Sequence, residues 1–177
     1  MVTVQGGSRR IDRILDPQYA DGLGAMSLDE LRSRHDECLA EREYLSLLRR
    51  LVQGRAEILK AEVERRGGTG QEGTLVERLS KVLSSEGHGT SRGEAVKVGL
   101  PEEELLQARR RVERLAMDAG LSDPTALDDR QLSGAVDVLE TEEQEVSRDR
   151  SAVIDVLDRV QDELKRRYKE DPSLVLS

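Results

Sequence analysis

The stretch from Leu132 to Leu164 reads LSGAVDVLETEEQEVSRDRSAVIDVLDRVQDEL, and it decides the fold that the sequence predicts. Steps of four and three residues from Leu132 meet an apolar residue at every position except two near the middle. The ten positions are Leu132, Val136, Leu139, Glu143, Val146, Arg150, Val153, Leu157, Val160 and Leu164. This spacing is typical of a coiled-coil seam, the face of a long helix that packs against a partner helix.

The same pattern occurs earlier in the chain, and the two copies align without gaps when Leu31 is matched to Leu132. The matching positions are Leu31, His35, Cys38, Arg42, Leu45, Arg49, Val52, Ala56, Leu59 and Val63. Charged residues occupy the same two central positions in both copies. The chain therefore contains an internal duplication of one long helix, on the order of 60 Å at ~1.5 Å per residue. The segment between the copies is long enough for the chain to reverse, so we expect antiparallel pairing within one chain.

This pattern predicts an all-α protein, an antiparallel helical hairpin (intramolecular coiled coil) of two long helices with short accessory helices. The expected segments are an N-terminal partner-docking or flexible segment (1–26), a first long helix (27–66), a linker with short helices (67–124), a second long helix (125–170) and a tail (171–177). Ser27 and Glu30 form the capping box that begins the first long helix. Within the linker, Pro101 predicts a helix over 101–119, and the Ser- and Gly-rich residues 84–99 predict mobility.

The composition limits what the chain can do. It has no Phe or Trp, so a thick core is not expected, and its net charge of −8 disfavours direct binding to DNA or anionic membranes. Its single cysteine, Cys38, cannot form an intrachain disulfide, and no signal peptide or membrane-spanning stretch is visible. We expect a cytoplasmic protein that is not an enzyme, because no nucleophile is paired with a base, and that holds no metal.

The polar interruption of the seam has the same composition in both copies. Each has a serine, an arginine three residues later and a carboxylate eight residues after the arginine. The first copy contains Ser46, Arg49, Gln53 and Glu57, and the second contains Glu143, Ser147, Arg150 and Asp158. At ~100° per residue, each set falls on one stripe of its helix.

Two interpretations of this interruption are open. In the first, the charges form an interhelix ion pair, such as Arg49 with Glu143, that only fixes the register of the helices. In the second, they bind guanine and phosphate, since arginine donates two hydrogen bonds to guanine O6 and N7. Two antiparallel copies would then match a two-fold symmetric ligand with two guanines and two phosphates, such as cyclic di-GMP.

The stretch Leu45–Leu59, LSLLRRLVQGRAEIL, resembles the first signature helix of the RsiG family. These actinobacterial anti-sigma factors carry the motif E(X)3S(X)2R(X)3Q(X)3D once on each of two antiparallel helices. Most motif positions match in both copies. The departures are Arg42 in place of Glu, Glu57 in place of Asp, and Ile154 in place of Gln. Glu41 or Glu43 could supply the carboxylate missing at position 42, although both lie about 100° off the stripe.

The resemblance implies that a cyclic-di-GMP dimer binds between the two helices, and that the complex sequesters a flagellar-type sporulation sigma factor and so inhibits transcription. Arg49 and Arg150 would read guanine, the carboxylates would accept hydrogen bonds from base edges, and Ser46 and Ser147 would support them. Two alternatives are a ligand-free coiled-coil adaptor whose seam charges set register, and a nucleotide sensor whose partner is not a sigma factor.

Overall fold

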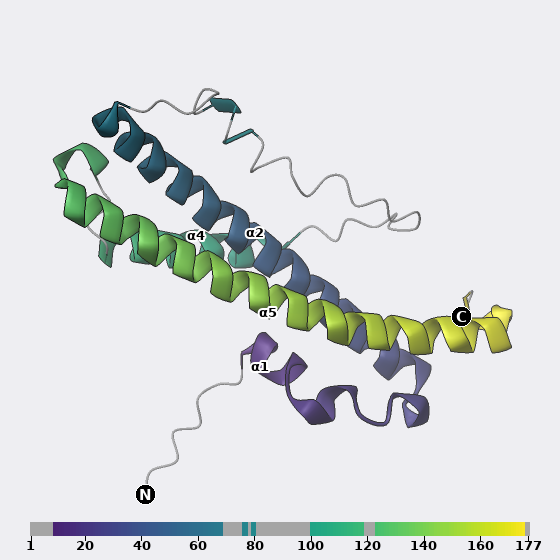
Figure 1. The fold of residues 1–177 in the computed structure, drawn as a ribbon. Helices are drawn as coiled ribbons and strands as arrows, with labels where there is room; N and C mark the ends of the chain where they lie inside the picture. The colour runs from purple at the N-terminus through teal and green to yellow at the C-terminus, as the bar shows by residue number, and fades with distance from the viewer. Residues whose placement is uncertain (1–8, 69–75, 78, 81–99, 119–122, 176–177) are drawn as a thin grey trace, which may run out of the picture. The chain divides into compact units, whose positions relative to one another are not determined.

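The computed structural model describes residues 9–68, 76–77, 79–80, 100–118 and 123–175. Its two long helices are α2 (Leu28–Gly67) and α5 (Asp129–Glu170), and its shorter ones are α1 (Arg10–Ile14) and α4 (Glu102–Asp118) (Figure 1). Four 3-10 turns flank the helices: η1 (Pro17–Ala20), η2 (Leu23–Ala25), η3 (Pro124–Ala126) and η4 (Pro172–Val175). No strand occurs in these residues, which confirms the all-α prediction. The predicted mobile stretch, residues 84–99, lies outside the described part of the chain.

Helix α2 begins where the sequence predicts. The backbone N–H of Glu30 donates to Ser27 Oγ at 3.2 Å, and the Ser27 N–H donates to the Glu30 carboxylate at 2.8 Å. This reciprocal pair is the predicted capping box. At the other end of α2, Gly68 has φ +67°, a left-handed conformation that glycine adopts without strain and that ends a helix.

Helix α5 begins at Asp129, four residues later than the predicted start near Thr125. Pro124–Ala126 forms a separate 3-10 turn, and Leu127 is extended with ψ 142°, so the helix cannot run through it. A second capping box marks the true start. The Gln131 N–H donates to Asp128 Oδ1 at 2.7 Å, and the Asp128 N–H donates to Gln131 Oε1 at 2.9 Å.

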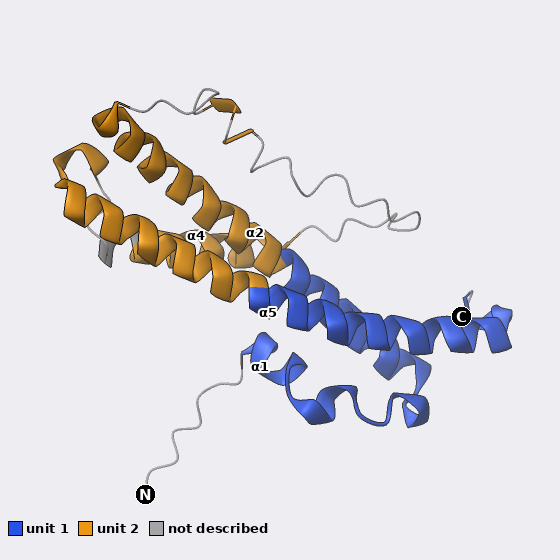
Figure 2. Cartoon of the chain, viewed as in Figure 1, with its two compact units in different colours: residues 1–43, 148–177 blue, residues 44–147 orange. Residues whose placement is uncertain are grey.

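The chain divides into two compact units, and each contains part of α2 and part of α5 (Figure 2). Unit 1 comprises residues 1–43 and 148–177, and unit 2 comprises residues 44–147. In unit 1, Leu31, Val160 and Leu164 form a buried cluster. The residues packed against this cluster are Leu23, Met26, Leu28 and Tyr168. The cluster joins the first turns of α2 to the last turns of α5, so the two helices are antiparallel here.

Polar contacts fix the N-terminal segment on α2 within unit 1. The guanidinium groups of Arg10 and Arg13 bond to the carboxylates of Glu41 and Glu37 respectively. The Tyr19 hydroxyl also donates to Glu37, at 2.9 Å. Ile14, the last residue of α1, is completely buried. The buried Ile14 and these ion pairs together hold the segment against α2.

In the described part of unit 2, α4 accompanies parts of α2 and α5. Its buried apolar residues are Leu45, Leu48, Val52, Ala56 and Leu59 of α2, Ala108 and Val112 of α4, and Leu132, Ala135, Leu139 and Val146 of α5. Helix α4 is tied to α5 by the ion pair between Arg111 and Glu142, at 2.8 Å. Leu48 and Ala135 are not seam positions, so a second buried face exists in this unit.

The predicted seam is confirmed along most of both helices but is wrong at Val63. Val63 is 42% exposed, whereas the neighbouring Glu62 is buried. Glu62 accepts hydrogen bonds from Arg65 and Arg66, and Arg66 also donates to the carbonyl oxygens of Pro124, Thr125 and Leu127. A polar contact with the loop before α5 therefore takes the place of an apolar one.

The same arrangement of a glutamate, two arginines and loop carbonyl groups occurs at the end of α5. Glu163 accepts from Arg166 and Arg167, and Arg167 donates to the carbonyl oxygens of Leu23 and Gly24 in the turn before α2. We call Glu62 with Arg66, and Glu163 with Arg167, the two helix-end clamps. Each clamp holds the loop that leads into the other long helix, a role that the sequence analysis did not assign to these residues. The described helices include none that is both long and apolar enough to cross a membrane.

Candidate functional site

Four of the predicted site residues meet in unit 2, around the carboxylate of Glu143. Its Oε1 atom accepts hydrogen bonds from Arg49 Nε at 2.8 Å, Gln53 Nε2 at 2.9 Å and Ser147 Oγ at 3.0 Å. Arg49 and Gln53 lie one turn apart on α2, and Glu143 and Ser147 lie one turn apart on α5. The spacing of each motif therefore places two polar residues of each helix opposite two of the other. We call these four residues the Glu143 cluster.

The Glu143 cluster is neither fully buried nor fully exposed. The side chain of Arg49 is 32% exposed and that of Glu143 is 24% exposed. Burial raises the pKa of Glu143, but the hydrogen bonds from Arg49 and Ser147 outweigh it and hold the pKa below its usual value. The carboxylate is therefore ionised at neutral pH. A charged donor and a charged acceptor lie side by side where solvent reaches both.

Ser46 and Glu57, the other two predicted residues of the first copy, are also in unit 2. Ser46 is only 1% exposed, so its hydroxyl faces the packed interior of the unit. Glu57 lies 3.8 Å from Lys60 Nζ, and Lys60 also pairs with Glu140 of α5 at 2.7 Å. The pKa of Lys60 is raised, chiefly by its hydrogen bond to Glu140. The sequence analysis missed Lys60, whose only signal is its position one turn after Glu57.

Arg150 and Asp158, the remaining predicted residues, belong to unit 1. Arg150 is half-buried, whereas Asp158 is exposed on α5. The two copies of the motif are therefore not equivalent in the structure, because Glu57 is half-buried and paired with Lys60. The four predicted residues of the second copy are thus divided equally: Glu143 and Ser147 belong to the cluster in unit 2, and Arg150 and Asp158 belong to unit 1.

The two main departures from the motif fall on a single crossing of the helices. In unit 1, Gln161 Nε2 lies 3.3 Å from His35 Nε2. Because the helices are antiparallel, seven residues after His35 on α2 correspond to seven residues before Gln161 on α5. This register brings Arg42 opposite Ile154. The repeat relates these two positions to Glu143 and Gln53, which bond to each other in unit 2. One interhelix Glu–Gln pair is therefore kept, and its duplicate is replaced on both sides.

The two carboxylates next to Arg42 both have partners within unit 1. Glu41 is buried and accepts a hydrogen bond from Arg10 of α1. Glu43 accepts from Arg42 Nη2 at 2.7 Å and Nε at 3.2 Å. Arg42 therefore forms an ion pair with Glu43, the next residue of α2.

The comparisons with known proteins support the resemblance that the motif indicates. No curated protein matches the chain. A family model described as RsiG-like matches residues 17–83, which include η1, η2, α2 and the first copy of the motif. The second copy, on α5, lies outside the matched residues. The matched copy is the one with Arg42, so that substitution does not remove the likeness to the family. Residues 17–83 are therefore similar to the RsiG-like family, as the sequence of α2 predicts.

Proposed function

We propose that this protein is an anti-sigma factor that binds cyclic di-GMP on its paired long helices and, in that form, sequesters a flagellar-type sporulation sigma factor. The family match supports the anti-sigma role, which is regulatory rather than enzymatic. The observation that carries the ligand is the Glu143 cluster, where residues of both motif copies converge on one partly exposed carboxylate.

The groups of the Glu143 cluster are those that a guanine base requires. The guanidinium of Arg49 can donate to guanine O6 and N7, and a carboxylate can accept from guanine N1–H and its amino group. Arg49 and Glu143 now satisfy each other, and a guanine offers each of them a replacement partner. The exchange leaves each charged group with a hydrogen-bond partner. It therefore avoids the cost of a buried charge without a partner, which is about 3–5 kcal/mol.

The phosphates of cyclic di-GMP need a cation, and Lys60 of unit 2 is a candidate. Lys60 lies one turn beyond Glu57 on α2 and is 37% exposed, so it can reach toward an anionic ligand. Two molecules of cyclic di-GMP, as the family resemblance implies, would fill the polar interruption and neutralise it. The sigma factor would then meet a surface made of both protein and nucleotide.

A ligand-free adaptor remains the second candidate, since the Arg49–Glu143 ion pair is what a register device requires. The two functions separate on one variant. In Arg49→Leu with Glu143→Leu, an adaptor keeps its partner, because replacing a paired charge by apolar residues is often neutral or stabilising. A cyclic-di-GMP sensor loses both the nucleotide and the partner.

Titration calorimetry with cyclic di-GMP, with and without the flagellar-type sigma factor of the same organism, tests the proposal. We expect nucleotide binding with two molecules per chain, and a protein complex that forms only when the nucleotide is present. Failure of the wild-type protein to bind the nucleotide would refute the ligand assignment. A complex of equal affinity without nucleotide would refute the dependence on cyclic di-GMP.

A further inference from the structure

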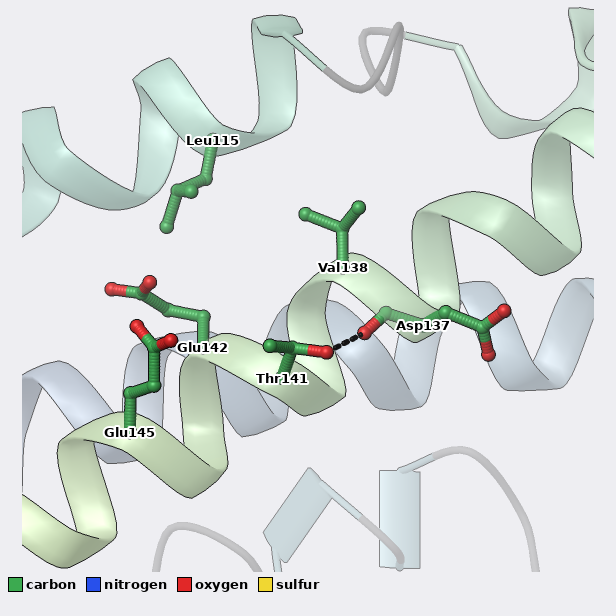
Figure 3. Close-up of a pocket in the computed structure, with 6 residues that line it drawn as sticks. All are labelled: Leu115, Asp137, Val138, Thr141, Glu142 and Glu145. Atoms are coloured by element: carbon green, nitrogen blue, oxygen red, sulfur yellow. Dashed lines mark hydrogen bonds between the residues drawn. The ribbon is translucent and has the colours of Figure 1, made fainter.

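An open groove lies between α4 and α5 in unit 2, next to the Glu143 cluster. It has a volume of about 310 Å³ and is lined by Leu115, Asp137, Val138, Thr141, Glu142 and Glu145. In Figure 3, Leu115 of α4 and Val138 of α5 point toward each other across it, and Glu142 and Glu145 lie to one side. The groove is therefore lined by two facing apolar side chains and by acidic residues along α5.

All the charged residues that line the groove are acidic. Three of its six lining residues are carboxylates and none is basic. Glu142 is bonded to Arg111 of α4, at 2.8 Å, but Asp137 and Glu145 form no ion pair with any residue that the structure describes. Val138 is 46% exposed, which is unusual for a valine on a helix that packs on two sides. The groove therefore presents both uncompensated negative charge and exposed apolar surface.

These properties suit one kind of occupant. A long lysine or arginine side chain can lay its apolar stem along Val138 and Leu115 and place its charged end among the carboxylates. Several such side chains on one protein surface are characteristic of proteins that contact DNA phosphates. A sigma factor is a DNA-binding protein, so its promoter-contacting surface has the chemistry that this groove complements.

The position of the groove links it to the proposed ligand site. Glu142 lines the groove, and the next residue, Glu143, holds Arg49, Gln53 and Ser147. Consecutive residues of a helix point ~100° apart, so the two sites occupy neighbouring faces of one turn of α5. A partner seated in the groove would lie beside nucleotide bound at the Glu143 cluster.

We propose that the groove between α4 and α5 is a docking surface for the basic, DNA-contacting surface of the sigma factor, resting on the function proposed above. The carboxylates take the place of DNA phosphates, and Leu115 with Val138 supplies the apolar contact. Binding in the groove and binding to promoter DNA are then mutually exclusive for the sigma factor. The assignment also gives α4, which lies outside the family match, a role in partner recognition.

The test is a charge reversal at the groove with a matched control. Asp137→Lys with Glu145→Lys changes two exposed residues that line it, and Glu113→Lys with Asp162→Lys changes two exposed residues of α4 and α5 that do not. Both variants alter the net charge equally. Affinity for the sigma factor is measured by fluorescence anisotropy with saturating cyclic di-GMP, and nucleotide binding by calorimetry.

We expect the groove variant to bind the sigma factor at least about tenfold more weakly, with unchanged nucleotide affinity, because the two new lysines would repel a basic surface. The control should stay within about twofold. Double-stranded promoter DNA should displace the wild-type protein from the sigma factor. Equal sigma affinity of the wild-type and groove variant, or equal losses in groove variant and control, would overturn the docking surface alone. A wild-type protein that does not bind the sigma factor would overturn the proposed function, and this inference with it.

Discussion

The Arg49–Glu143 contact allows a quantitative prediction for the stability of the protein. The perturbation is a double-mutant cycle that compares Arg49→Leu, Glu143→Leu and the two combined. Exposed ion pairs contribute about 0.2–1 kcal/mol, and removing one partner of a buried pair costs about 3–5 kcal/mol. With side chains 32% and 24% exposed, this pair falls between the two cases. Each single variant should therefore lose about 2 kcal/mol of unfolding free energy.

The double variant should differ from the wild type by less than about 1 kcal/mol, because no charge is left without a partner and two leucines suit the seam. The coupling energy from the cycle is then about 3 kcal/mol or more, well above the ~0.5 kcal/mol expected for independent sites. Urea unfolding followed by circular dichroism measures all four proteins. Additive losses in the double variant would show that the pair does not form and would refute the reasoning from the Glu143 cluster.

Three further predictions concern other parts of the molecule. The clamps hold the pKa values of Glu62 and Glu163 at about 2, from 4.5, through hydrogen bonds from their neighbouring arginines. Their contribution to the free energy of unfolding is therefore complete above the unfolded pKa and is lost as the pH falls from 4.5 toward 2. The variant Glu62→Gln with Glu163→Gln should lose less stability than the wild type over that pH range in acid unfolding. An acid unfolding profile identical to that of the wild type would contradict this. Ile14→Ala should cost about 2–4 kcal/mol in urea unfolding, because the side chain is completely buried; a loss below about 0.5 kcal/mol would show that α1 is not packed. Arg42→Glu with Ile154→Gln should restore the second interhelix pair and tighten cyclic-di-GMP binding about tenfold, which is roughly the contribution of one charge-assisted hydrogen bond. Weaker binding in calorimetry would mean that Arg42 itself contacts the ligand.

The seam and the first capping box could be predicted from the sequence because both depend on local spacing. Leu31 and Leu132 begin matching runs of apolar residues, and most of those positions are buried. Ser27 and Glu30 are three residues apart, a separation that one helical turn imposes. Convergence on Glu143 also followed from spacing, since the expected partner of Arg49 is the one observed.

The failures have a common physical cause, which is that each depends on contacts between distant segments. Val63 continues the apolar spacing, but Glu62 is buried instead because Arg66 bonds to carbonyl groups about sixty residues away. The position of α4 against α5 depends on Arg111 meeting Glu142, which no periodicity shows. The late start of α5 was the exception, since Asp128 and Gln131 are a readable capping box that Thr125 and Pro124 obscured.

The two helix-end clamps have a consequence for how the chain tolerates being cut. Arg66, at the end of α2, holds the backbone that precedes α5, and Arg167, at the end of α5, holds the backbone that precedes α2. Each long helix is thus fastened by noncovalent bonds at the point where the other one begins. All the residues that form these two fastenings lie outside the stretch 69–99. A protein nicked by a protease within that stretch keeps the bonding groups of both clamps, so the two fragments should elute together as one particle.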